Sequence, residues 1–291
     1  MPAATEAKIY RGRLAPSPTG FLHLGHSMTF WTAQQRAIAN SGQLVLRIED
    51  LDRERCKPEF RAAILDDLRW FGFAWNEGPD VGGPHAPYVQ SGRREHYLAA
   101  WEKLRAHGFI YPCTCSRRDV LGALAAPHVG EDESHYPGTC RSREGTISEL
   151  TNPAGVNWRF RVPQNEVVSF VDENLGPQRA VAGADFGDFI VWRKDDIPAY
   201  QLAVAVDDAA MRISEVVRGE DLLGSTFRQL LIYRALGCEP PAFFHSPLVT
   251  DENGRRLAKR ENALSLRTLR QRGADAAELR GRVLENRGYF A

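Results

Sequence analysis

Residues 13–26 read RLAPSPTGFLHLGH, and this stretch decides the fold. It overlaps a run from Lys8 to Ala15 that predicts a short strand, and it leads into a helix expected from about Gly25 to Asn40. The Pro-Ser-Pro-Thr-Gly turn therefore joins the end of a strand to the N-terminus of a helix. Backbone N–H groups and the helix dipole favour anions at such a junction. The stretch thus predicts a phosphate-binding site.

Two histidines three residues apart, His23 and His26, mark the start of this helix. Their imidazoles can donate hydrogen bonds to triphosphate oxygens while negative charge builds up in a transition state. Gly25 has no side chain, so a flat nucleobase can approach the backbone closely. For the His-x-Gly-His pattern alone, a capped surface helix with two incidental histidines is the alternative. The Pro-Ser-Pro-Thr-Gly approach directly after a strand favours nucleotide binding.

The elements that follow predict an α/β fold. Gln43–Ile48 alternates like a strand, Pro58 suits the first turn of a helix that runs to about Trp70, and Arg93–His107 predicts another helix. Strands that alternate with helices in this order predict a parallel sheet with helices on its faces. The alternation resumes late in the chain, after an apolar run at Tyr200–Val206, with a strand at Ile213–Val217, a helix at Ser225–Leu236 and a strand at Phe243–Thr250.

Residues 111–185 interrupt this alternation. They hold a cysteine cluster, scattered Gly and Pro, and short alternating runs at Val156–Val162 and Val167–Val171. We therefore expect an inserted subdomain with its own small sheet. The predicted organisation is a first catalytic half at 8–110, the insertion at 111–185, a second catalytic half at 186–250, and a loop with a short basic segment at 251–291.

Composition narrows the class of protein. Lys plus Arg and Asp plus Glu number 37 each, so the charge of the whole chain does not indicate a nucleic-acid-binding protein. Between Arg255 and Ala291, ten Lys/Arg stand against four Asp/Glu, which suits either a contact with phosphates or a solvated basic helix face. Met1–Lys8 lacks the apolar core of a signal peptide, and no apolar run approaches the roughly 20 residues that cross a bilayer. We expect a cytoplasmic protein without a membrane segment.

Five cysteines in a chain without an export signal argue against a disulfide framework. Cys113, Cys115 and Cys140 fall close together in the sequence and could bind zinc, which would stabilise an insertion too small to bury its own core. Three thiolates are one short of the usual set of four ligands. Tyr136, His128 and His135 are the candidates for the fourth, and chemistry alone favours a histidine because phenolate is an uncommon ligand. Reduced cysteines without a metal are the alternative.

Residues 13–26 resemble the HIGH signature of class I aminoacyl-tRNA synthetases, and the Arg-Leu-Ala-Pro-Ser-Pro-Thr-Gly part resembles the glutamyl branch. Gly254–Arg260, GRRLAKR, is similar to the second signature of that class, the KMSKS loop, with Ala258 in place of its first serine. The resemblance implies a Rossmann-like catalytic domain. It also implies that Lys259 contacts the ATP phosphates, and that His23, His26 and Lys259 stabilise the transition state of adenylate formation with Mg²⁺ on the triphosphate.

A glutamate pocket needs arginine forks for two carboxylates and an acid for the ammonium group. The resemblance places these groups, because Arg13 and Ser17 match glutamate-binding residues and Glu49 matches the acid that holds the ammonium group. Tyr200 and Arg218 match the remaining pocket residues, and we expect each match at a strand end or loop. Taken singly, a loop cap at Glu49, a core tyrosine at Tyr200 and a surface ion pair at Arg218 are the alternatives.

The pattern Cys-x-Cys followed by Tyr-x-x-x-Cys is similar to the zinc site of glutamyl-Q tRNA(Asp) synthetases, which implies that Tyr136 is the fourth ligand. Only 32 residues follow Lys259, too few for the helical anticodon-binding region of a full glutamyl-tRNA synthetase. The resemblance extends over Lys8–Leu269. It implies an enzyme that activates L-glutamate with ATP without tRNA, then transfers it to the queuosine base in the anticodon stem-loop of tRNA(Asp). We expect a monomer with structural Zn²⁺.

Three other functions remain open. The chain could be a truncated glutamyl-tRNA synthetase that charges a tRNA 3′ end. It could also be a non-catalytic paralogue that binds tRNA or glutamate, although the presence of His23, His26 and Lys259 argues against this. A ligase with the same fold that joins a small-molecule acid through its adenylate would share the adenylate step and differ only in the acceptor.

Overall fold

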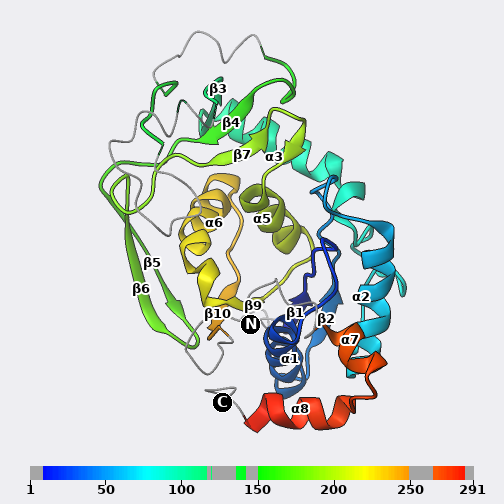
Figure 1. Ribbon diagram of the computed structural model, residues 1–291. Coiled ribbons are helices and arrows are strands. Elements are labelled where there is room, and N and C mark those ends of the chain that lie inside the picture. Colours follow the sequence, from blue (N-terminus) through cyan, green and yellow to red (C-terminus); the bar gives the residue numbers. More distant parts are fainter. Residues whose placement is uncertain (1–8, 117–118, 120–135, 142–149, 249–264, 286–291) are drawn as a thin grey trace, which may run out of the picture. The chain divides into compact units, whose positions relative to one another are not determined.

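The computed structural model describes residues 9–116, 119, 136–141, 150–248 and 265–285. Two compact units make up the chain, and Figure 1 labels helices and strands of both. The first unit contains the residues around the HIGH-like stretch, and the second contains the cysteine cluster. Their residues are 1–92, 211–223 and 241–291 for the first unit, and 93–210 and 224–240 for the second.

Parallel strands form the centre of the first unit. Strand β1 (Arg11–Leu14) pairs in parallel with β2 (Gln43–Leu46), and β9 (Glu215–Gly219) pairs in parallel with β10 (Ala242–Ser246). The N–H group of Ser214 donates to the carbonyl of Arg11 at 2.9 Å, so the segment that enters β9 lies beside β1. The parallel sheet predicted from the order of strands and helices is confirmed.

Two helices supply much of the core of this unit. Helix α1 (Leu24–Ala39) packs against β1, β2 and β9, and α2 (Pro58–Phe71) places Ile64, Leu68 and Phe71 in the same buried cluster. These three side chains recur at helical spacing, and burial of each contributes about 1.5–3 kcal/mol. Pro58 occupies the first turn of α2, and Gly72 ends the helix in a left-handed conformation with φ of 95°.

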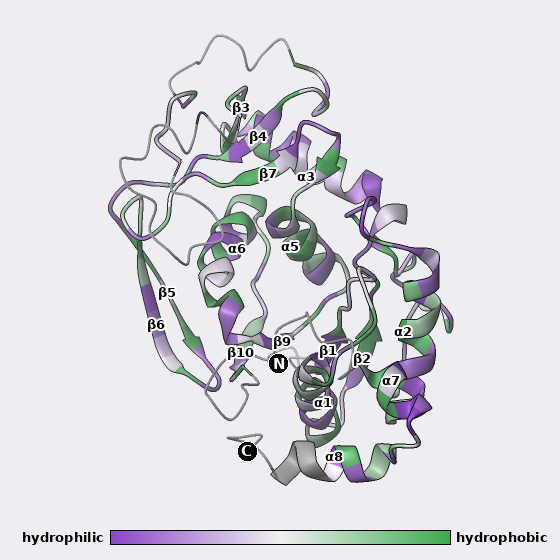
Figure 2. Cartoon of the chain, in the orientation of Figure 1, coloured by the Kyte–Doolittle hydropathy of each residue, from purple (hydrophilic) through white to green (hydrophobic). Residues whose placement is uncertain are grey.

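The end of the described chain forms two further helices, α7 (Leu266–Gln271) and α8 (Ala276–Glu285), which contact α2. Leu266 is fully buried, and Leu279 packs against the core cluster. Arg280 donates to the carbonyl of Phe71 at 2.7 Å and so satisfies a backbone acceptor at the end of α2. Figure 2 shows hydrophobic and hydrophilic stretches side by side on α7, as expected of a helix that packs on one face. Neither helix was predicted from the sequence.

The second unit contains an antiparallel sheet with the strand order β3–β4–β7–β8. Strands β5 and β6, which do not belong to this sheet, pair antiparallel from Glu166 opposite Ala182. They are joined by a turn in which Asp172 accepts from Asn174 and Leu175. The strands are β3 (Ile110–Cys113), β4 (Asn157–Phe160), β5 (Glu166–Asp172), β6 (Gly176–Ala182), β7 (Ile190–Arg193) and β8 (Ile197–Pro198).

Among its described residues, the second unit has three helices: α3 (Arg94–Ala106), α5 (Tyr200–Ala210) and α6 (Leu223–Leu236). Only the first residue of α6 lies outside the unit. A buried ion pair of 2.6 Å joins Arg93 to Asp207, and the hydroxyl of Tyr97 donates to the same carboxylate at 2.9 Å, which fixes α3 to α5. Two short 3₁₀ turns, at Gln90–Gly92 and Glu220–Leu222, belong to the first unit. Within the described residues, every helix is too short or too polar to span a membrane.

Candidate active site

The N-terminus of α1 carries both histidines of the HIGH-like stretch. His23 is the N-cap residue in an extended conformation, and its carbonyl accepts from the N–H groups of His26 and Ser27 at 3.0 and 3.3 Å. The two imidazole centroids are 6.3 Å apart, and His26 is exposed. Both rings are therefore adjacent at a positive helix end, which suits contact with an anion.

The proline-containing turn before α1 is held by the loop that follows β2. Glu49 donates its N–H to the carbonyl of Pro16 at 3.0 Å, and Lys57 donates its N–H to Pro18 at 3.2 Å. Arg47 extends the β1–β2 pairing by donating to Leu14 at 2.8 Å. The turn is thus anchored by backbone contacts, and the Glu49 loop lies directly beside it.

Two buried arginines lie on neighbouring strands close to the carboxyl ends of the sheet. Arg13 on β1 is 5% exposed and donates from Nη1 to the carbonyl of Val217 at 2.8 Å, next to Arg218 on β9. Arg218 is 3% exposed and donates from Nε to Nε2 of His245 on β10 at 3.2 Å. The side chain of Arg13 therefore reaches the backbone of the residue that precedes Arg218. Guanidinium groups on neighbouring strands suit a ligand with two carboxylates.

Glu49 lies three residues beyond the end of β2, at the same edge of the parallel sheet. Its Oε1 atom accepts from Nη2 of Arg47 at 2.9 Å, and the side chain of Arg47 is completely buried. Arg47 also lies 3.9 Å from the sulfur of Met211. The hydrogen bond from the buried Arg47 therefore fixes the position of the Glu49 carboxylate. This restricts the directions from which a ligand's ammonium group can contact the carboxylate.

The remaining predicted pocket residues are placed separately. Ser17 is exposed in the proline-containing turn, where its carbonyl accepts from Thr19. Tyr200 belongs to the second unit and is 39% exposed. The expectation that it lies at a strand end or loop is wrong, because Tyr200 is the first residue of α5. Lys259 lies outside the described residues.

Sequence reasoning missed two residues that position this site. Arg47 orients Glu49, and its signal was a charged residue inside an otherwise apolar strand. His245 accepts from Arg218, and the two are Cα partners in the β9–β10 register. His245 is completely buried. Only strand pairing reveals that contact, because the two residues are 27 positions apart.

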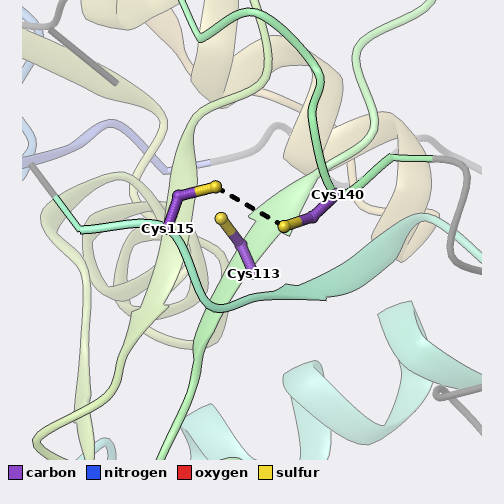
Figure 3. A group of neighbouring side chains, drawn as sticks. All are labelled: Cys113, Cys115 and Cys140. Atoms are coloured by element: carbon purple, nitrogen blue, oxygen red, sulfur yellow. Dashed lines mark hydrogen bonds between the residues drawn. The ribbon is translucent and has the colours of Figure 1, made fainter. Parts of the chain in front are cut away.

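A second cluster, in the second unit, is made by Cys113, Cys115 and Cys140, whose sulfur atoms all lie within 4.8 Å of one another (Figure 3). The sulfurs of Cys115 and Cys140 are 3.6 Å apart. Tyr136 joins them, with its hydroxyl 3.4 Å from Cys113 Sγ and 3.5 Å from Cys115 Sγ. His128 and His135, the other candidates for a fourth ligand, lie outside the described residues.

The protonation of this cluster follows from its hydrogen bonds. Burial alone would raise the pKa of Cys140, but contacts from the Tyr136 hydroxyl, the Thr114 backbone and the other two thiols outweigh it and hold the pKa at about 6. Burial and the neighbouring sulfurs raise the pKa of Tyr136 well above its usual range. A metal at this site would therefore have to displace the phenolic proton if Tyr136 were a ligand.

The buried cation Arg159 lies against the same cluster. Its Nε donates to Cys113 Sγ at 3.3 Å, and its guanidinium carbon is 3.9 Å from the centre of the Tyr136 ring. Its Nη1 donates to the backbone carbonyl of Asp188 at 3.1 Å. A cation beside three sulfurs is compensated when the cluster is anionic, as it is with zinc bound to thiolates. The donor set and its surroundings therefore fit zinc.

Comparison with known proteins places the chain in a family. The model of the class I tRNA synthetase catalytic domain (E and Q) matches residues 10–289. The chain belongs to this family. The match continues beyond Leu269, where the resemblance seen in the sequence ended, and includes α7 and α8.

Individual relatives narrow the family further. The chain is 46% identical over 280 residues to the glutamyl-Q tRNA(Asp) synthetase of Nitratidesulfovibrio vulgaris, covering 94% of this chain and 85% of that protein. It is 42% identical over 272 residues to glutamate–tRNA ligase 2 of Acidithiobacillus ferrooxidans, covering 93% of this chain and 56% of that protein. The resemblance to the glutamyl-Q tRNA(Asp) synthetase family is confirmed.

A solved structure agrees with this assignment. The glutamate tRNA ligase of Elizabethkingia meningosepticum, in complex with its amino acid, matches with a TM-score of 0.76 at 30% identity. The match covers 87% of this chain and 52% of that chain. The predicted fold class, a class I synthetase catalytic domain with a parallel sheet, is confirmed.

Proposed function

We propose that this chain activates L-glutamate with ATP as glutamyl-adenylate, without tRNA, and transfers the glutamyl group to the queuosine base of tRNA(Asp). The observation that carries the proposal is the 46% identity to a glutamyl-Q tRNA(Asp) synthetase over nearly the full length of this chain. The arrangement of Arg13, Arg218 and Glu49 at one sheet edge supports glutamate as the acid, since it offers two cations for two carboxylates and one anion for the ammonium group.

In the first step, an oxygen of the glutamate α-carboxylate attacks the α-phosphorus of ATP, and the bond to pyrophosphate breaks. His23 and His26 donate hydrogen bonds to phosphate oxygens, together with the cation of Lys259. Mg²⁺ bound to the triphosphate neutralises part of its charge. Buried Arg13 and Arg218 hold the amino acid in a fixed orientation, so that positioning and charge stabilisation lower the barrier.

In the second step, a hydroxyl oxygen of the queuosine base attacks the activated carbonyl, AMP leaves, and the hydroxyl proton is released. The active-site residues named above all act in the formation of the adenylate, and none is assigned to the acceptor. The proposal of an acceptor therefore rests on the similarity to glutamyl-Q tRNA(Asp) synthetases. The anticodon stem-loop of tRNA(Asp) is the proposed partner.

We also propose that Cys113, Cys115, Cys140 and Tyr136 hold a structural zinc ion. When bound, zinc links segments of the second unit that are far apart in the sequence. Arg159 supplies the compensating positive charge, and the low pKa of Cys140 supports thiolate formation near neutral pH.

The proposed first step is tested by glutamate-dependent exchange of pyrophosphate into ATP in the absence of tRNA. Exchange is expected with L-glutamate and is expected to be much weaker with glutamine, aspartate or D-glutamate. His23→Ala is expected to lower the rate without unfolding the protein. Purified, folded protein that shows no glutamate-dependent exchange would overturn the enzymatic proposal and leave the non-catalytic alternative.

A further inference from the structure

The segment that enters α7 lies directly against the HIGH-like stretch. The N–H group of Leu266 donates to the carbonyl of Leu22 at 2.7 Å, and Ser265 forms an isolated antiparallel bridge with His23. Ser265 also caps α7 by accepting from the N–H group of Thr268. The backbone that carries His23 is therefore held on one side by the first residues of α7.

The next residue, Arg267, extends this contact through its side chain. Its guanidinium carbon lies 5.3 Å from the centre of the Phe21 ring, two residues before His23. On the side of α2, its Nε is 3.6 Å from Asp67 Oδ1 and its Nη2 is 3.8 Å from Asp66 Oδ2. Phe21 in turn meets the edge of Phe60 on α2, with centroids 5.2 Å apart. One cation thus joins α2, α7 and the segment before His23.

The ion pair with Asp67 holds the Arg267 side chain in position. Its side chain is completely buried on α2, and within the described residues neither carboxylate oxygen has a hydrogen-bond partner. Burial raises the pKa of this carboxyl group, and Arg267 is the main group that counteracts the rise. Arg267 contributes most of the incomplete compensation of this buried carboxylate, with a smaller contribution from Arg270. The carboxylate therefore attracts the arginine, because separation would leave the charge still less compensated.

We propose that Arg267 is a positioning residue for adenylate formation, which sets the His23 backbone, and with it the His23 imidazole, through Phe21 and the Leu22–Leu266 contact. This inference rests on the proposed function, because it assigns a role in that reaction. It concerns no direct contact with ATP. Asp67 holds the Arg267 guanidinium in place, and the guanidinium in turn packs over the ring of Phe21 in the HIGH-like stretch.

This role has a kinetic signature. The residues that we assign to glutamate binding have partners of their own: Arg13 donates to the Val217 carbonyl, Arg218 to His245, and Glu49 accepts from Arg47. Displacement of His23 weakens contacts to the phosphates as charge develops, so the turnover number falls while the KM for glutamate is unchanged. A shift of about 1 Å in a catalytic group costs roughly 10- to 100-fold in rate.

Arg267→Met tests this in the ATP–pyrophosphate exchange assay, with Arg267→Lys and Arg272→Met beside it. Arg267→Met is expected to lower the exchange kcat roughly 10- to 100-fold at an unchanged KM for glutamate. Arg267→Lys is expected to restore part of kcat, since it keeps the charge near Asp67 but lacks the planar group over Phe21. Arg272→Met, at an exposed arginine that ends the same helix, is the matched control and is expected to behave as wild type.

Asp67→Asn separates positioning from folding. It removes a poorly compensated buried charge, so the melting temperature is expected to stay level or rise, while kcat falls because Arg267 loses its anchor. Unchanged kcat in both Arg267→Met and Asp67→Asn, or a loss of activity in proportion to the loss of folded protein, would overturn the inference.

A spectroscopic measurement distinguishes this failure from failure of the proposed function. The imidazole resonances of His23, assigned with His23→Gln, are expected to shift in Arg267→Met and not in Arg272→Met. Wild-type protein without exchange activity would contradict the proposed function. His23 resonances that do not respond to Arg267→Met would contradict the positioning role.

Discussion

Arg13→Lys tests the glutamate pocket without changing its charge. Arg13 is buried, and its Nη1 already donates to the carbonyl of Val217 at 2.8 Å. The other donors of the guanidinium fork are the ones that we assign to a glutamate carboxylate. A lysine has a single ammonium group at the end of a flexible chain, so it can satisfy the Val217 carbonyl or the ligand with good geometry, but not both.

The size of the effect follows from how many hydrogen bonds the bound glutamate gives up. A hydrogen bond to a charged group contributes about 1.5–3 kcal/mol. Loss of one such bond to the carboxylate corresponds to roughly a 10- to 150-fold increase in the KM for glutamate, since about 1.4 kcal/mol is a factor of ten in an equilibrium constant. The KM for ATP is expected to change much less, because the phosphates are assigned to His23, His26 and Lys259.

The assay is glutamate-dependent ATP–pyrophosphate exchange, with the two substrates varied separately. Arg272→Lys is the control for a general loss of stability, since Arg272 is exposed. An unchanged KM for glutamate in a folded Arg13→Lys protein would refute the placement of the amino acid. An equal rise in the KM values for glutamate and ATP would also refute it, because the defect would then not be specific to the pocket.

Three further predictions concern other parts of the chain. His245→Leu removes the acceptor for Arg218 Nε and is expected to raise the KM for glutamate about 10-fold, measured by the same exchange assay; no change would mean that His245 does not position Arg218. Cys140→Ser is expected to lose the zinc that wild-type protein retains, measured by plasma mass spectrometry after gel filtration; equal zinc in both would exclude Cys140 as a ligand. Burial raises the pKa of Asp67 above its usual 3.8. The folded protein therefore binds this proton more tightly than the unfolded chain does, which adds to the free energy of unfolding at low pH. That contribution is lost as the pH rises through the pKa of Asp67 in the folded protein. Asp67→Asn is therefore expected to melt higher than wild type at about pH 7, by a margin that shrinks toward about pH 4; a constant margin in thermal melts would contradict this.

Some elements of the fold could be predicted from neighbouring residues in the sequence. Pro58 and Gly72 mark the two ends of α2, and the apolar spacing between them defines its buried face. The turn before α1 is equally explicit in residues 16–20. The apolar run of Tyr200–Val206 was not assigned a conformation, because continuous burial hides the period that separates a strand from a buried helix. It forms α5, whose residues from Gln201 to Asp208 are all buried.

The candidate site was predictable where it depends on residue type and order, and not where it depends on pairing across the fold. Arg13, Glu49 and Arg218 follow from motifs, and the structure places the first and last on neighbouring strands, where Arg13 donates to the carbonyl of Val217. Arg47 contacts Glu49, two residues further along the chain, and its charge inside an apolar run is a local signal. His245 acts through a contact between two strands that no local pattern encodes. The same holds for Arg267, since α2 and α7 are far apart in the sequence and only the packed core brings Asp67 and Phe21 to it.

The central claim is the transfer of glutamate to queuosine, and labelled acceptor RNA tests it most directly. The protein is incubated with radiolabelled glutamate, unlabelled ATP and tRNA(Asp). The tRNA either contains or lacks queuosine, and both forms are tested with and without the 3′-terminal adenosine. The proposal predicts labelling that requires queuosine and persists when the terminal adenosine is removed. Labelling that ignores queuosine and requires an intact 3′ end would contradict it and would favour a tRNA-charging glutamyl synthetase.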